Sequence, residues 1–200
     1  MHGVAASLLE RAGYSDADAP GARRVAESVL GPGCVYRMPT SVARAPAWLA
    51  IVHGQARIYV RTGLAPEHRN FLIGHELAEW ALARDGYRGD DIEEAADAIA
   101  ACLVAPRAAF RAALREIGER YDELADAFVC TESLAALRVG ETTGEPMALV
   151  TPRSVRVRGD GEWVWPAEDE MRRVARRGHP GLRRARLRDD PRRVVLRAVG

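Results

Sequence analysis

The sequence contains no lysine, only three cysteines and no long apolar stretch. Its apolar runs fall short of the roughly 18 residues that a membrane-spanning helix needs, so we expect no such helix. No basic residue precedes Glu10, and the N-terminal residues therefore do not predict a secretion signal. All 29 basic residues are arginine, which we interpret as coding bias from a GC-rich genome rather than as chemistry.

The three cysteines, Cys34, Cys102 and Cys130, are odd in number and widely spaced. This argues against a disulfide framework and suits a reducing cytoplasm. They also lack the CxxC spacing of a structural zinc site. Because free cysteine is usually buried, we expect three small core residues in a cytoplasmic protein.

The composition is typical of a soluble globular protein, with 48% hydrophobic and 28% charged residues. The net charge of +1 hides an asymmetry between the two ends of the chain. Residues 151–200 hold 14 arginines against 7 acidic residues, whereas residues 1–150 hold 15 arginines against 21 acidic residues. Because the composition changes near Gly140, we expect one domain over residues 1–140 and a small basic, β-rich extension over residues 141–200.

Apolar spacing and turn residues predict a mixture of helices and strands. Helices are expected over residues 4–12, 20–30, 66–85, 91–104, 107–119, 121–129, 132–139 and 167–177. Strands are expected over residues 34–38, 48–53, 56–61, 148–150, 154–158, 162–165, 185–188 and 194–197. This order predicts an α+β fold, in which a small mixed sheet from residues 34–62 packs on a helical core and a β-rich extension follows.

The residues that can carry chemistry begin with the helical segment Phe71–Glu79. His75 and Glu79 are four residues apart and share one helix face, so both can bind one metal ion. Glu76 points elsewhere and can act as a general base. A catalytic zinc site needs three protein ligands and one open position, where the pKa of water falls from about 15.7 to about 7. We therefore interpret this segment as the metal-binding helix of a zinc-dependent peptidase.

A third ligand must come from another element, and the next predicted helix offers Glu93 and Asp97. These two residues are again four apart and share a helix face. Glu93 can serve as a metal ligand, and Asp97 can accept the second ring proton of His75. Glu94 lies one position off this face and is expected to face solvent.

The pattern over His75–Glu79 is weak evidence by itself, because any amphipathic helix can carry it on a solvated face. Its flanks, Phe71–Gly74 and Trp80–Leu82, are apolar and place the ionisable residues in or beside a buried stripe. Clustered acids in such a place are costly unless a cation lies between them. His53 and His68 could line the same cleft, although a surface position is the ordinary expectation for each.

Three blocks of the sequence resemble the ImmA/IrrE family of metallopeptidases. The first block, Ile58–Leu77, is similar to the family's strand, short loop, Arg-Phe pair and H-E-L-G-H helix. The second, Glu93–Pro106, looks like the family's E-x-x-A-N-x-F-A-x-x-L-L-M-P helix. The third, Leu124–Arg138, is similar to its L-A-x-x-F-x-V-S segment that ends in arginine. The likeness covers about residues 20–140, in the family's order.

The resemblance implies a zincin-like core in which His75 and Glu93 bind the metal ion and Glu76 is the general base. Glu79 stands where the family has its second histidine, so it would be a substitute ligand. A carboxylate is a valid zinc ligand, but it makes the site harder and more anionic, which shifts its preference toward manganese or iron. The other departures, such as Asp97 for asparagine, do not bear on the chemistry.

The resemblance also implies a substrate class. Known members of the family are cytoplasmic and cleave helix-turn-helix repressors, often those encoded beside them on mobile elements or in stress regulons. The favoured function is a metal-dependent endopeptidase in transcription regulation, with a substrate strand pairing along Ile58–Arg61. Two alternatives stay open: a catalytically inactive binding or regulatory protein, to which Glu79 points, and a nucleic-acid-binding regulator that uses the arginine-rich residues 151–200.

Overall fold

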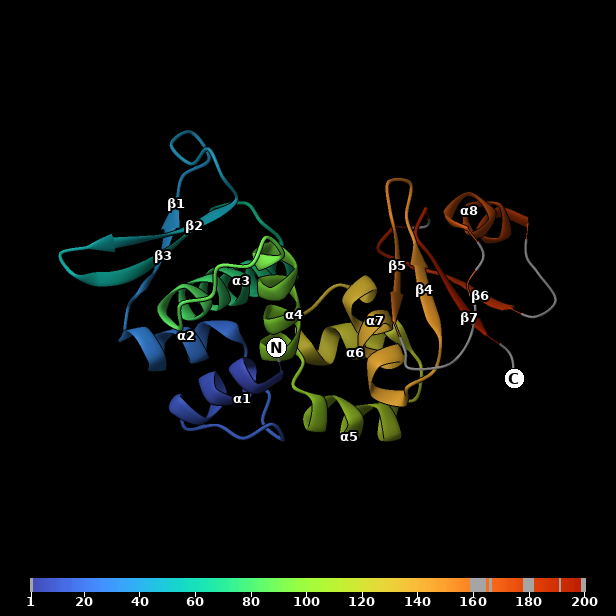
Figure 1. Cartoon of the computed structure of the whole chain (residues 1–200), viewed down its shortest axis with the longest axis horizontal. Coiled ribbons are helices and arrows are strands. Elements are labelled where there is room, and N and C mark those ends of the chain that lie inside the picture. The colour runs from blue at the N-terminus through green and yellow to red at the C-terminus, as the bar shows by residue number, and fades with distance from the viewer. Residues whose placement is uncertain (1, 159–164, 166, 178–181, 191, 199–200) are drawn as a thin grey trace. The chain divides into compact units, whose positions relative to one another are not determined.

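The computed structural model describes residues 2–158, 165, 167–177, 182–190 and 192–198, which form two compact units (Figure 1). Unit 1 comprises Met1–Ala109 and Phe128–Cys130, and unit 2 comprises Phe110–Ala127 and Thr131–Gly200. Within the described residues there are eight helices and two small sheets, which confirms the predicted α+β class. None of the described helices is long and apolar enough to cross a membrane.

Unit 1 contains four helices and a three-stranded sheet. The helices are α1 (His2–Arg11), α2 (Ala22–Leu30), α3 (Pro66–Arg84) and α4 (Ile92–Val104), and the strands are β1 (Val35–Met38), β2 (Ala47–Val52) and β3 (Gln55–Arg61). Each lies within a few residues of the predicted range. Cys34, Cys102 and Cys130 are buried, as the sequence predicts.

The sheet of unit 1 is mixed, with the strand order β1-β3-β2. β1 runs parallel to the central strand β3, whereas β2 runs antiparallel to it. The β2–β3 turn falls at His53 and Gly54, one residue before the predicted position, and both have positive φ angles, of 51° and 77°. Two such residues form the tight hairpin turn whose twist matches that of the strands, which fixes the register of β2 beside β3.

The two faces of this sheet differ because side chains alternate along a strand. Ile58 and Val60 of β3 are buried, and β2 and β3 both pack against α3. Tyr59 points to the other face, where its ring stacks between Tyr36 and Trp48 at centroid distances of 5.4 and 5.2 Å. The sheet therefore uses one face as a platform for the helices.

The longest helix, α3, begins with Pro66 in its first turn, where the missing N–H leaves no hydrogen bond unmade. It packs most extensively against α4, which is rich in buried alanine. At Gly74 the two helices come so close that an added Cβ atom would lie 3.4 Å from Ala100 and from Ala22 of α2. Small side chains at this crossing hold α3 and α4 side by side along the turns that follow.

Unit 2 combines short helices with a second sheet. Its elements are α5 (Arg107–Ile117, whose first residues belong to unit 1), α6 (Tyr121–Phe128), α7 (Glu132–Thr143), α8 (Glu168–Arg177), β4 (Met147–Val150), β5 (Val155–Arg158), β6 (Leu182–Arg186) and β7 (Val194–Ala198). The sheet is antiparallel, in the order β5-β4-β7-β6, and α8 packs on β4 and β7. The strand expected over residues 162–165 lies outside the described residues, apart from Trp165.

We predict that Gly74→Leu destabilises the protein, because its side chain must enter the space that Ala100 and Ala22 already fill. Overpacking of this kind costs about 1–3 kcal/mol in the free energy of unfolding, measured by chemical denaturation. The matched control is Gly74→Ala, whose single methyl group makes an ordinary contact and improves helix propensity by up to about 1 kcal/mol. A leucine variant as stable as the wild type would show that the helices are not in contact here.

Candidate metal centre

The structure brings together five ionisable side chains from α3 and α4 of unit 1. His75, Glu76 and Glu79 lie on α3, whereas Glu93 and Asp97 lie on α4. Because the two helices pack closely at Gly74, the imidazole ring of His75 reaches the first two turns of α4. Each of the five residues singled out in the sequence is therefore near the others in space.

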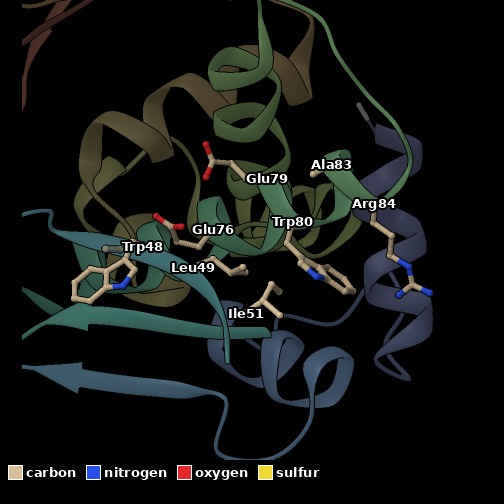
Figure 2. A pocket seen from close by; sticks show the side chains of 9 residues that line it. Trp48, Leu49, Ile51, Glu76, Glu79, Trp80, Ala83 and Arg84 are labelled. Atoms are coloured by element: carbon tan, nitrogen blue, oxygen red, sulfur yellow. The ribbon is translucent and has the colours of Figure 1, made fainter. Parts of the chain in front are cut away.

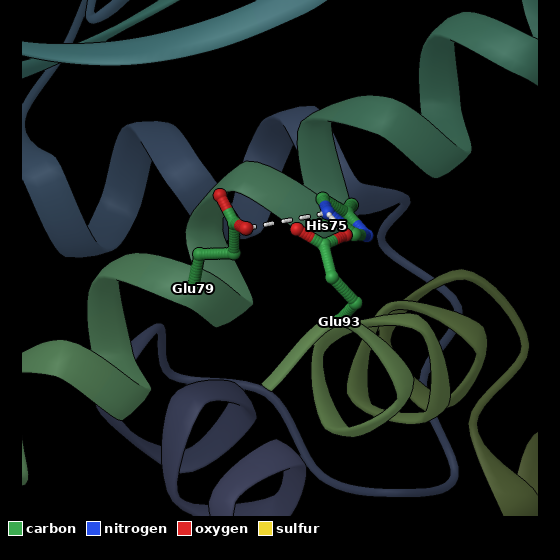
Figure 3. Close-up of side chains that lie close together, drawn as sticks. All are labelled: His75, Glu79 and Glu93. Atoms are coloured by element: carbon green, nitrogen blue, oxygen red, sulfur yellow. Dashed lines mark ion pairs between the residues drawn. The ribbon is translucent and has the colours of Figure 1, made fainter. Parts of the chain in front are cut away.

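Three of these residues form a group that can hold a metal ion (Figure 3). The Nε2 atom of His75 lies 3.6 Å from Oε1 of Glu79 and 3.5 Å from Oε2 of Glu93, and all three ligand atoms lie within 4.8 Å of one another. A tetrahedral ion with bonds of about 2.1 Å separates its ligand atoms by about 3.4 Å. The observed spacing thus fits a small divalent cation between His75, Glu79 and Glu93.

The other nitrogen of His75 faces Asp97. Nδ1 lies 3.0 Å from Oδ1 of Asp97, so the carboxylate can accept the Nδ1 proton and leave the Nε2 lone pair toward the acidic pair. This hydrogen bond raises the pKa of His75 above its ordinary value of 6.5, against the opposing effect of burial, and the charge of Glu79 raises it further. Asp97 therefore both orients the ring and makes it more basic.

Glu76 occupies a different environment from the three candidate ligands. Its side chain is only 7% exposed, and burial raises the pKa of its carboxyl above the ordinary value of 4.5. The nearby charge of Glu79 also raises this pKa, whereas His75 and a hydrogen bond from the Leu49 main chain lower it. A carboxylate with a raised pKa is a better proton acceptor near neutral pH than an exposed one.

A cleft of about 650 Å³ lies between β2 and the second half of α3 (Figure 2). Its walls include Glu76 and Glu79 from the helix and Trp48, Leu49 and Ile51 from the strand. Because Glu79 belongs both to the candidate ligands and to the wall, the cleft borders the candidate metal centre. Its size and its mixture of apolar and acidic walls fit a segment of polypeptide.

The expectation that a substrate strand pairs along Ile58–Arg61 is wrong. β3 is the central strand and is already hydrogen-bonded to β1 and to β2. Within the described residues, β2 is the edge strand beside the cleft, and it pairs only with β3. The sequence did not reveal that β3 is the central strand, because strand order depends on which distant segments pair. Local patterns do not encode the parallel pairing of β1 with β3.

Some cleft residues were not anticipated from the sequence, chiefly Leu49, Trp80 and Arg84. Trp80 directly follows Glu79 on the same helix, so its place in the cleft could have been predicted from the sequence. Leu49 acts through its main chain, which hydrogen-bonds to Glu76, and this role leaves no signal in the sequence. His68 is 57% exposed and lies 3.6 Å from Glu67, so it is a surface residue. Glu94 is exposed, as expected.

We predict that Asp97→Asn lowers the pKa of His75 in metal-free protein, measured by an NMR pH titration of the imidazole ring. Because the folded-state pKa is raised, protonated His75 contributes stability that is complete below about pH 6.5 and is lost as the pH rises through the folded-state value. Asp97→Asn should thus reduce the free energy of unfolding more at about pH 5.5 than at about pH 9. Glu94→Gln, on the same helix but exposed, is the control. An unchanged His75 pKa in Asp97→Asn would contradict the interaction.

Comparisons with known proteins identify the family and a similar fold. The family model of Peptidase M78, described as the IrrE N-terminal-like domain, matches residues 38–139, just over half of the chain. No curated protein matches the chain. A solved structure of a Mycobacterium tuberculosis transcriptional regulator is similar in fold, with a TM-score of 0.59 and 15% sequence identity. The match covers 92% of this chain but only 64% of that structure, which is less than two thirds of its length. The resemblance found in the sequence is confirmed, and the chain belongs to the Peptidase M78 family of IrrE N-terminal-like domains.

Proposed function

We propose that the protein is a metal-dependent endopeptidase that cleaves a protein regulator. Membership of a peptidase family supports hydrolysis of peptide bonds. The observation that carries the proposal is the placement of Glu76, which is buried, has a raised pKa and lines the same cleft as the candidate ligand Glu79. A proton acceptor beside a divalent-cation site is the minimal equipment for hydrolysis by activated water.

The zincin-like assignment gives each of the five site residues a role. His75, Glu79 and Glu93 would hold the ion, and Asp97 would fix the tautomer of His75. A bound ion supplies Lewis-acid chemistry that makes water nucleophilic near neutral pH. Glu76 would take the proton of the attacking water and deliver it to the leaving amine. Its burial raises its pKa, which favours uptake of the proton.

Zinc is the proposed ion, with manganese or iron as alternatives that the ligand set allows. Two of the three ligands are carboxylates, which are harder donors than imidazole and favour harder cations. Glu79 also adds a negative charge where a histidine would be neutral. This charge opposes ionisation of metal-bound water at the site. Because the ligand set allows more than one metal, the ion must be identified by direct analysis.

The free edge of β2 gives the proposed substrate a way to bind. An extended peptide can hydrogen-bond to the outer edge of β2 and place its backbone beside Leu49 and the acidic wall of the cleft. Main-chain pairing recognises any extended segment, so selectivity depends on the side-chain contacts around Trp80 and Ile51. The cleft is thus suited to a flexible stretch of a protein substrate.

The substrate class, location and domain roles are part of the same proposal. We assign peptidase activity to residues 1–140 and treat residues 141–200 as a basic, β-rich C-terminal extension. A helix-turn-helix repressor is the proposed substrate, which would make the protein a cytoplasmic regulator of transcription, encoded on a mobile element or in a stress regulon. The family match supports a protein substrate in general terms.

The first test of this proposal is metal analysis of the purified protein. We expect about one zinc, manganese or iron ion per chain, and loss of that ion in Glu79→Ala and His75→Ala, because each removes a ligand. Glu94→Gln, which changes an exposed acid next to Glu93, should keep the ion. Wild-type protein without bound metal would overturn the enzyme proposal and favour a non-catalytic binding protein.

The second test is a cleavage assay on a helix-turn-helix protein encoded beside this gene. We expect a defined pair of fragments by mass spectrometry, and a rate about 10²–10⁴ times lower for Glu76→Gln, which cannot accept a proton. The comparison is valid only if Glu76→Gln retains the same metal content as the wild type. Equal rates for the two proteins would contradict the role of Glu76.

A further inference from the structure

A second cavity, of about 560 Å³, lies within unit 2 and has no part in the proposed peptidase chemistry. Four of its nine lining residues are arginines that come from three different segments: Arg172 and Arg176 from α8, Arg186 from β6, and Arg192 from the β6–β7 connection. Its volume falls in the range of small-molecule sites in proteins. The cavity is therefore large enough for a ligand and strongly basic.

Two of the four arginines are already neutralised by acidic neighbours. Arg172 forms an ion pair with Glu168, and one of its guanidinium nitrogens donates to the main-chain oxygen of Thr151 at 2.7 Å. Arg192 is paired with Asp190 through one edge of its guanidinium group, whose Nε and Nη2 atoms donate to the two carboxylate oxygens at 2.9 and 3.0 Å. These contacts hold both side chains in place at the cavity and leave little free charge on them.

Arg176 and Arg186 differ from this pair because no acidic side chain in the described part of unit 2 contacts either of them. Arg176 is in the last turn of α8, where a basic residue often interacts with the terminal carbonyl groups of a helix. Here Arg184 of β6 takes that role, since it donates to the main-chain oxygens of Ala175 and Arg176. The guanidinium group of Arg176 is thus not needed to end its own helix.

The alternation along β6 explains why Arg186 reaches the same cavity. Leu182 packs into the core beneath α8, and Arg184 contacts the end of α8, so residues 182, 184 and 186 share the face toward that helix. Arg183 points to the opposite face and does not line the cavity. Arg176 of α8 and Arg186 of β6, which no acidic side chain among the described residues of unit 2 contacts, therefore line one concavity.

The floor of the cavity is apolar. Val150, Ala175 and Val194 line it and are also members of the buried core of unit 2. A ligand that fits both parts carries an anionic group for the arginines and a less polar body for the floor. The planar guanidinium group matches a phosphate in geometry through paired, charge-assisted hydrogen bonds.

We propose that this cavity binds a small organic phosphate, whose phosphoryl group is held by Arg176 and Arg186. The recognised chemistry is the phosphoryl group, and the apolar floor favours an organic phosphate over an inorganic one. A concave site distinguishes such a ligand from duplex nucleic acid, whose backbone requires an open basic surface. Unit 2 would then be the part of the chain that responds to a small molecule.

The test measures binding of ADP, pyrophosphate and adenosine to the full-length protein by isothermal titration calorimetry. We expect saturable binding of one ADP per chain, weaker binding of pyrophosphate and none of adenosine. The double variant Arg176→Gln/Arg186→Gln should bind ADP about a hundredfold more weakly, because two charge-assisted hydrogen bonds are lost. Circular dichroism of each variant verifies that the fold is intact.

The matched control is Arg177→Gln/Arg183→Gln, which removes the same charge from the same helix and strand without touching the cavity. We expect its ADP affinity to stay within about threefold of the wild type. An equal loss of ADP affinity in the two double variants would overturn the site in favour of general electrostatic attraction. The same conclusion would follow if a DNA duplex bound more strongly than ADP and lost affinity equally in both variants. Absence of saturable binding of both ADP and pyrophosphate would overturn it too.

Discussion

The close packing of α3 on α4 at Gly74 and Ala100 is the constraint on which the candidate metal centre depends. Two helices with ordinary side chains at the crossing sit about 8–10 Å apart, and small residues keep them at the near end of that range. His75 follows Gly74 directly, so it lies one residue from this tight contact. From there its ring meets both Glu93 and Asp97, which share one face of α4.

The same packing concentrates negative charge around one imidazole ring. Glu79, Glu93 and Asp97 each lie within 3.6 Å of a ring nitrogen of His75. Glu76 adds a fourth carboxyl nearby, and burial and the charge of Glu79 both raise its pKa. A protonated imidazole offsets only one of these charges, whereas a divalent cation offsets two and can contact three ligands at once. The arrangement is thus easier to account for with a metal ion than without one.

The arginine-rich end of the chain carries less uncompensated positive charge than its composition indicates. Several of its arginines are paired inside unit 2, among them Arg188 with Asp122 and Arg197 with Glu119. The basic excess over residues 151–200 is therefore compensated in part by acids from earlier in the sequence. Arg176 and Arg186 have no acidic partner among the described residues of unit 2, and both line the same cavity.

Local sequence patterns predicted most of the elements and the residues of the candidate site. Helical spacing identified His75 and Glu79 on one face, and a second i, i+4 pair supplied Glu93 and Asp97, because these relations are local and repeat with the helix. Strand order, the edge beside the cleft and the convergence of Arg176 with Arg186 were decided only by the tertiary structure. Each of these depends on which distant segments pack together, and that is set by the shape and burial of whole elements rather than by any local pattern.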